Sequence, residues 1–249
     1  DDSQLAGISA IVELPLGLVE YDSAAMYRSL QHRRPTINGM SGAAPPHYRA
    51  LSRALLDRDP AGLTALGSLG PLLVAAREDV SEQDAWSPLL DHLPSARRVS
   101  RKGEWTFFRV EPAEHIASAC HGSAAAPQSA HTEHGPVPVA VITDGNPRTS
   151  WVSRFEPPRS ETLVLDLGEG TARRTCGLSV SLGALAYTYP AQLAVDVSTD
   201  GEHWTLIRDV PLAAAAIRGA LKDQADARIE VDWEPVEGRW IRLRRMASD

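Results

Sequence analysis

The chain has 249 residues, of which 43% are hydrophobic and 23% charged, with a formal net charge of −7. This composition is ordinary for a globular protein, and the length allows one large or two ordinary domains. The negative charge argues against broad nucleic-acid affinity, because binding phosphates requires a basic face. No apolar run approaches the roughly 18–20 residues that a membrane-spanning helix requires.

Residues 1–111 alternate between predicted strands and helices. Apolar runs predict strands at 8–16, 71–77 and 104–110. Helical spacing, prolines and capping residues predict helices at 23–33, 47–58, from Asp59-Pro60 onward, and after Ser81, where Asp84 completes an approximate capping box. The strand at 8–16 lacks clean alternation, as expected for a strand covered on both faces. The pattern predicts a small α/β domain at residues 1–111.

Residues 112–249 are rich in predicted strands. Glu161–Gly168 alternates, with Leu163, Leu165 and Leu167 on one face. LAVDVSTDGEHWTLI predicts two strands joined as a hairpin through Asp200-Gly201. The polar loop at 123–138 is the segment we expect to be most mobile.

Four motifs in the second half occur in a family order: DGNPRTSW, LDLG, YPAQLAVDVSTDGEHW and a final IRLR strand. In this order residues 112–249 resemble the discoidin, or F5/8 type C, family. The resemblance implies an all-β, galactose-binding-like β-sandwich (jelly-roll) that works by binding or adhesion, without catalysis.

The same resemblance suggests carbohydrate-binding residues in loops at one end of the sandwich. Arg154 and Phe155 follow the DGNPRTSW turn, and Tyr187 and Tyr189 lie in GALAYTYP. An exposed aromatic ring can stack on a pyranose, while an arginine fork orients its hydroxyl groups. The proline after Tyr189 favours a structural role for that residue.

In this family the turn containing Asp144, Asn146 and Thr149 often holds a structural Ca²⁺, which takes hard oxygen ligands. The family's site usually adds an acid from a strand ending in Glu-Ile-x-Val, and this chain ends instead in IRLRRMASD. The alternative is an Asx turn whose polar groups bond to one another.

VELPLG, MYRSLQHRRPTINGMSG and PPHYRAL, within residues 8–110, resemble the extracytoplasmic C-terminal region of bacterial polytopic membrane glycosyltransferases. This resemblance implies a parent enzyme that uses a lipid-linked sugar donor at the cell envelope. The present chain would be its non-catalytic, periplasmic or cell-surface tail, with the membrane-embedded part of the same polypeptide and a glycan as partners. Glu13, His32, Asn38 and Ser41 are candidates to face acceptor or donor, and a buried polar network explains them equally well.

Because the start DDSQLAG lacks the cationic segment of a signal peptide, we expect a mature chain or an excised fragment. A free-standing secreted carbohydrate-binding or adhesion module is the alternative function.

Cys120 and Cys176 are the two cysteines, and they form either a disulfide or two buried thiols. His131 and His134, with Cys120-His121 upstream, raise the question of a zinc site, but their spacing fits no known pattern and a solvated loop is the default. GMSGA at 39–43 lacks the second glycine of the hydrolase motif G-x-S-x-G, which favours a tight turn over a nucleophile.

Overall fold

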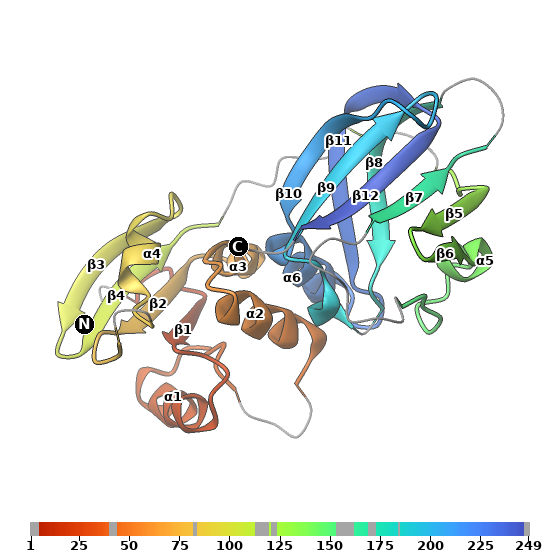
Figure 1. The fold of residues 1–249 in the computed structure, drawn as a ribbon. Helices are drawn as coiled ribbons and strands as arrows, with labels where there is room; N and C mark the ends of the chain where they lie inside the picture. Colours follow the sequence, from red (N-terminus) through yellow and green to blue (C-terminus); the bar gives the residue numbers. More distant parts are fainter. Residues whose placement is uncertain are drawn as a thin grey trace. The chain divides into compact units, whose positions relative to one another are not determined.

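The computed structural model describes residues 5–39, 44–81, 84–112, 120, 124–152, 162–168, 173–183 and 185–246 (Figure 1). The chain divides into two compact units, Asp1–His115 (unit 1) and Ile116–Asp249 (unit 2). Within the described ranges, no helix combines the length and apolar character needed to cross a bilayer.

Unit 1 is built on a four-stranded sheet in the order β1-β2-β4-β3. β1 (Ala10–Leu14) runs parallel to β2 (Leu72–Arg77), and β4 (Trp105–Val110) lies antiparallel to both β2 and β3 (Ala96–Lys102). Helices α1 (Val19–His32), α2 (Pro46–Leu56), α3 (Ala61–Ala65) and the 3₁₀ helix η1 (Leu66–Leu69) connect β1 to β2, and α4 (Ser87–Asp91) precedes β3. This confirms the α/β pattern of the first half.

The register of the strands gives the sheet two different faces. One face carries fully buried apolar side chains, including Val12, Val74 and Phe108 on three adjacent strands. The other face carries Glu13, Ala75 and Phe107 at the neighbouring register position. The second face therefore combines apolar and charged groups, and it is the face on which the pocket of unit 1 lies.

Two local predictions in unit 1 need correction. β3, with the sequence ARRVSRK, was not predicted, because its charged side chains hide the alternation of an edge strand. Ser81 does donate a hydrogen bond to Asp84 at 2.5 Å, but that bond closes a turn, and α4 begins at Ser87 with Pro88 in its first turn.

Unit 2 contains a six-stranded sheet in the order β10-β9-β12-β7-β5-β6 and a two-stranded sheet of β11 and β8. The elements are β5 (Ser129–Thr132), β6 (Gly135–Val137), α5 (Val139–Ile142), β7 (Thr162–Asp166), β8 (Arg173–Ser181), η2 (Ala186–Thr188), β9 (Gln192–Ser198), β10 (Thr205–Pro211), α6 (Ala213–Lys222), β11 (Arg228–Gly238) and β12 (Trp240–Met246). β9 and β10 form the predicted hairpin through Asp200-Gly201, and Leu165 and Leu167 are buried as predicted.

The core of unit 2 is the layer between its two sheets. Val195, Ile241 and Leu243 of the larger sheet are buried, as are Ile229 and Val231 of β11. The alternation of buried and exposed residues along β11 is the period-2 pattern of a strand with one covered face. Unit 2 is thus the β-sandwich that the motif order predicted.

The 123–138 segment differs from the mobile loop that we expected. It contains the hairpin of β5 and β6, and β5 also pairs with β7, so that His131 lies opposite Val164. Backbone hydrogen bonds to a neighbouring strand do not require apolar side chains. A polar segment can therefore form a strand that its side-chain pattern does not predict.

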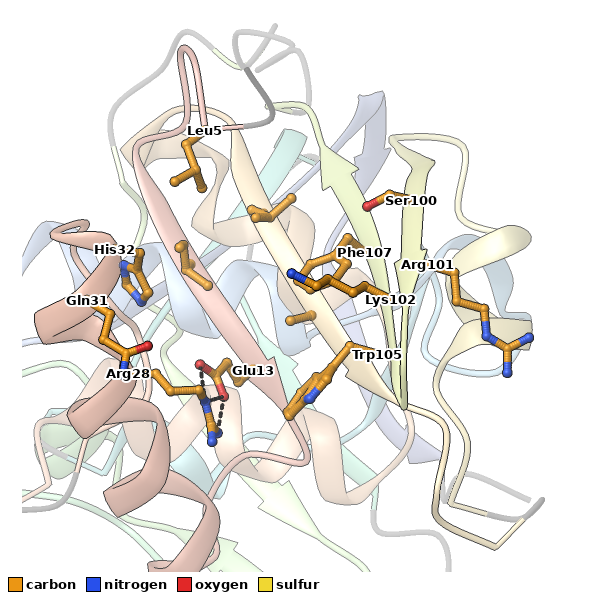
Figure 2. A pocket seen from close by; sticks show the side chains of 13 residues that line it. Leu5, Glu13, Arg28, Gln31, His32, Ser100, Arg101, Lys102, Trp105 and Phe107 are labelled. Carbon is orange, nitrogen blue, oxygen red and sulfur yellow. Dashed lines mark hydrogen bonds and ion pairs between the residues drawn. The ribbon is translucent and has the colours of Figure 1, made fainter. Parts of the chain in front are cut away.

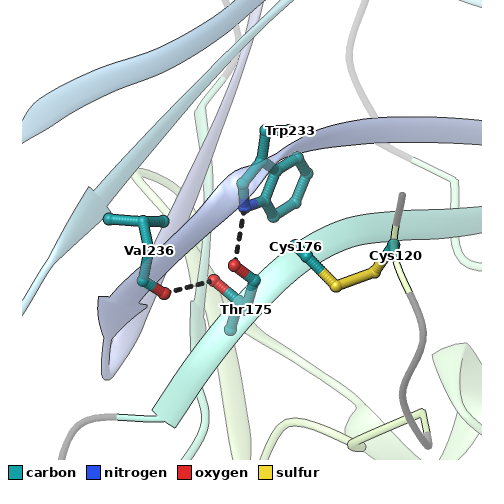
Figure 3. Close-up of a disulfide and its surroundings, with 5 residues drawn as sticks. All are labelled: Cys120, Thr175, Cys176, Trp233 and Val236. Atoms are coloured by element: carbon teal, nitrogen blue, oxygen red, sulfur yellow. Dashed lines mark hydrogen bonds between the residues drawn. A yellow bond between two sulfur atoms is a disulfide. The ribbon is translucent and has the colours of Figure 1, made fainter. Parts of the chain in front are cut away.

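Cys120 and Cys176 form a disulfide, with their Cα atoms 5.3 Å apart (Figure 3). Beside it, the Trp233 indole donates a hydrogen bond to the carbonyl of Thr175 at 3.2 Å, which links β11 to β8. The disulfide resolves the open alternative for the cysteines and removes Cys120 from any zinc site. In the described part of the chain, no three His, Cys, Asp or Glu side chains are grouped to hold a metal ion.

Candidate functional site

The turn that carries the proposed Ca²⁺ ligands is held by its own hydrogen bonds. Asp144 accepts from the Asn146 backbone N–H at 2.8 Å and from the Thr149 hydroxyl at 2.6 Å, and the Asn146 side chain accepts from the Arg148 N–H at 3.1 Å. The Thr149 and Asn146 hydrogen bonds lower the pKa of Asp144 below its ordinary value. The three predicted residues are therefore together, in an exposed Asx turn with one carboxylate. Ca²⁺ binding at this turn stays a prediction.

The loop after β8 packs directly against this turn. A Cβ added at Gly183 would lie 2.4 Å from the carbonyl oxygen of Pro147, and Gly183 has a φ of +54°. Gly183 and Leu182 also exchange backbone hydrogen bonds with Ala227, which precedes β11. The close approach requires glycine and places the turn at 144–149 beside the loop that leads to Tyr187.

The predicted carbohydrate-binding residues have different surroundings. Tyr187, in η2, is partly exposed, whereas Tyr189 is only 4% exposed and belongs to the core. In this conformation the Tyr189 ring is not accessible to a ligand. Its burial agrees with the structural role expected from the proline that follows it. Arg154 and Phe155 lie outside the described residues.

Unit 1 has a separate pocket of about 510 Å³ on the mixed face of its sheet (Figure 2). Its apolar floor comes from three adjacent strands, through Ile11, Leu73, Ala75 and Phe107. Helix α1 lies beside β1 and contributes Arg28, Gln31 and His32. The pocket therefore joins an apolar surface to a wall of polar side chains.

An ion pair between a buried carboxylate and a partly exposed guanidinium forms part of that polar wall. The Arg28 Nε donates to both carboxylate oxygens of Glu13, at 3.1 and 2.9 Å, and Nη2 donates to one of them. The Arg28 guanidinium also lies 5.3 Å from the centroid of the Trp105 ring, within range of a cation–π interaction. Glu13, predicted as a ligand-facing residue, thus does line a pocket.

His32 also lines the pocket. Burial lowers the pKa of His32, although the Glu13 carboxylate opposes that shift. The His32 Nδ1 accepts a hydrogen bond from the Arg34 backbone N–H at 3.1 Å, which leaves the proton of the neutral ring on Nε2. Nε2 is buried and has no hydrogen-bond partner in the part of the chain that the structure describes.

Asn38 lies away from the pocket, in a structural network. It is 2% exposed, and its side chain bonds the backbone of Glu13 at both N–H and C=O and donates to Asp22 on α1. Tyr48 donates to the same Asp22 carboxylate at 2.5 Å. Burial, together with that hydrogen bond, raises the pKa of Tyr48. Ser41 lies outside the described residues.

The sequence reasoning missed Arg28, Lys102 and Trp105 as residues of the pocket. The alternation of EWTFFRV at 104–110 did carry a usable signal, because it places Trp105 and Phe107 on one face of a strand. Nothing in the sequence shows that this face meets Glu13.

Similar solved structures include carbohydrate-binding modules. Chitosan-binding module 1 of a chitosanase/glucanase from Paenibacillus sp. IK-5 shares 14% identity over 51% of this chain and 88% of its own, with a TM-score of 0.36. A CBM32 module from Clostridium perfringens in complex with GalNAc-β-1,3-galactose shares 16% identity over 50% of this chain and 90% of its own, with a TM-score of 0.34. The C-terminal domain of a chitobiase from Bacteroides fragilis shares 18% identity over 48% of this chain and 79% of its own, also with a TM-score of 0.34.

No curated protein matches the chain. A family model does match, over residues 123–248, and it describes the F5/8 type C domain. That match spans half of the sequence and coincides with the sandwich of unit 2. The chain therefore belongs to the F5/8 type C domain family.

Proposed function

We propose that unit 2 binds carbohydrate at the end of the sandwich that carries Tyr187 and the turn at 144–149. The observation that carries this proposal is the contact between Gly183 and Pro147, which holds two loops with the predicted ligand residues side by side. Membership in the F5/8 type C family supports a binding role, and a partly exposed tyrosine provides a stacking surface for a sugar ring.

The experiment is a glycan-array screen of the purified chain. Tyr187→Ala and Arg154→Ala should each lower specific binding at least tenfold, because one removes the ring surface and the other the charged fork. Tyr27→Ala is the matched control, since Tyr27 is an exposed tyrosine of α1 in unit 1. Absence of binding by the natural chain, or equal losses in the Tyr27 and Tyr187 variants, would reject the proposed site.

A structural Ca²⁺ at Asp144, Asn146 and Thr149 is a separate part of this proposal. The turn offers side-chain oxygens of the type that Ca²⁺ takes, although the Asp144 carboxylate already bonds within the turn. Thermal unfolding with Ca²⁺ and with a chelator tests it. A rise in melting temperature that Asp144→Asn abolishes supports the site, and identical curves remove it.

We further propose that the chain is the non-catalytic, extracytoplasmic tail of a cell-envelope membrane glycosyltransferase that uses a lipid-linked donor. The motifs of residues 8–110 support this context. The coding sequence upstream of Asp1 should then encode several membrane helices. A short upstream region with only a secretion signal would favour a free-standing secreted adhesion module instead.

A further inference from the structure

The pocket of unit 1 has the size and surface of a small-molecule site. Its volume of about 510 Å³ lies within the range of roughly 300–1,000 Å³ that is usual for ligand pockets. The floor is a continuous apolar patch in which Ile11 and Leu73 are buried and Phe107 is partly exposed. An occupant should therefore have one apolar face.

The polar wall has hydrogen-bonding capacity that the protein does not use. The His32 Nε2–H is a buried donor that has no partner among the described residues, and leaving such a donor unpaired is unfavourable because it has lost its hydrogen bonds to water. The Arg28 Nη1 group makes no hydrogen bond to Glu13, whereas Nε and Nη2 do. The occupant should accordingly carry acceptor atoms on the side that faces α1.

The charges that line the pocket do not cancel. Glu13 and Arg28 neutralise each other, and His32 is neutral. Lys102 adds a positive charge and has no ion-pair partner among the described residues. In Figure 2 its side chain extends over Phe107 toward the pocket, whereas the guanidinium of the neighbouring Arg101, which also lines the pocket, points away from Phe107. The residues that line the pocket therefore carry an excess of positive charge beside the apolar floor.

From these features we infer that the pocket of unit 1 binds a saccharide that carries one negative charge. The C–H face of the sugar ring covers the floor at Phe107, and its hydroxyl groups accept from His32 and donate to the Glu13 carboxylate. Its anionic group lies near Lys102. A uronic acid and a glycosyl phosphodiester share this chemistry. The site is independent of carbohydrate binding by unit 2.

Isothermal titration calorimetry of the full chain tests the ligand class. D-glucuronate and the methyl phosphodiester of glucose 1-phosphate are the two charged sugars, and whichever binds more tightly identifies the source of the charge. D-glucose keeps the ring without the charge, and hexanoate keeps the charge on an apolar body. We expect at least one charged sugar to bind tenfold more tightly than D-glucose and hexanoate. Equal binding of hexanoate, or no binding of either charged sugar, would overturn the inference.

Two matched variants test the position of the charge. Lys102→Met should weaken binding of the charged sugar at least tenfold while leaving D-glucose unchanged. Lys222→Met removes the same charge from an exposed lysine at the end of α6 in unit 2, outside the pocket lining, and should change affinity less than twofold. Equal losses of affinity in the two variants would mean that only the general surface charge affects binding, which would contradict binding of the charged sugar in the pocket.

A third variant separates this site from the proposed site of unit 2. Tyr187→Ala should leave binding of the charged sugar unchanged. If that variant instead abolishes it, the sugar binds to unit 2 and the inference about unit 1 is wrong. If the Lys102 variant alone abolishes it, the pocket is supported whether or not the glycan array finds a ligand for unit 2.

Discussion

The Arg28 Nε donates to both carboxylate oxygens of Glu13, at 3.1 and 2.9 Å, and so joins α1 to β1. Glu13 is 7% exposed, and the Asn38 side chain bonds its backbone on both sides. The same Asn38 donates to Asp22 on α1. Two polar connections therefore fix the helix against the first strand, and only the connection through Arg28 faces the pocket.

Replacing Arg28 by Met should destabilise unit 1, because it leaves the buried Glu13 carboxylate without its counter-ion. Loss of one partner of a fully buried pair costs roughly 3–5 kcal/mol, and we expect about 1–3 kcal/mol here because the Arg28 side chain is 38% exposed. Urea unfolding measures the change. Arg53→Met is the control, since the exposed Arg53–Asp57 pair within α2 should contribute only about 0.3–0.5 kcal/mol. Equal effects of the two substitutions would contradict this account.

Unit 2 should lose stability in acid through Asp196, which is 2% exposed and accepts hydrogen bonds from Arg244 at 2.7 Å and Arg242 at 3.0 Å. Burial alone would raise the pKa of Asp196, but the two arginines outweigh burial and lower it. The stabilisation is therefore complete above the unfolded-state pKa of about 3.9 and disappears as the pH falls through the lower folded-state pKa.

Asp196→Asn tests this pH dependence. At pH 7 the substitution should cost about 2 kcal/mol, because the two guanidinium groups lose their charged acceptor and one carboxylate oxygen is replaced by an NH2 group that cannot accept. Between pH 5 and pH 2 the natural chain should lose stability more steeply than the variant, as measured by calorimetric unfolding at each pH. Parallel curves would show that other groups cause the acid sensitivity.

The Cys120–Cys176 disulfide should contribute substantially to unit 2, because it closes a loop with a sequence separation of 56. Restriction of the unfolded chain by such a loop corresponds to about 4 kcal/mol in the chain-entropy model. The double substitution Cys120→Ser, Cys176→Ser should lower the free energy of unfolding of unit 2 by about 2–4 kcal/mol. Limited proteolysis should then cleave unit 2 first, with unit 1 unaffected as the internal control.

Gly183→Ala should both destabilise unit 2 and weaken glycan binding. The added Cβ would overlap the Pro147 carbonyl oxygen and push the two loops apart, in addition to the strain of a positive φ. Gly201→Ala is the matched control, since Gly201 also has a positive φ of +81° but its Cβ would meet Trp240 at an ordinary 3.5 Å. We expect about 1 kcal/mol for the control from backbone strain and a clearly larger loss at Gly183. Equal losses would mean that only backbone strain matters.

The sequence by itself determined the features that local patterns encode. An apolar run located β4, alternation located β7, and Asp200-Gly201 located the β9–β10 hairpin, because these patterns depend on neighbouring residues. The order of four motifs was sufficient to indicate the F5/8 type C sandwich. Each strand, turn and motif among these signals is formed by residues close together in the chain, and only the order of the motifs spans the second half.

Only the tertiary structure decided what distant segments do together. The charged edge strand β3, the pairing of Cys120 with Cys176 and the contact of Gly183 with Pro147 depend on strand order and register. The pocket of unit 1 likewise joins Glu13, Arg28 and Lys102 from β1, α1 and β3. A local sequence pattern predicts which side chains share one face of a strand. The parallel crossover from β1 to β2 and the register of β3 determine which of those side chains contact one another.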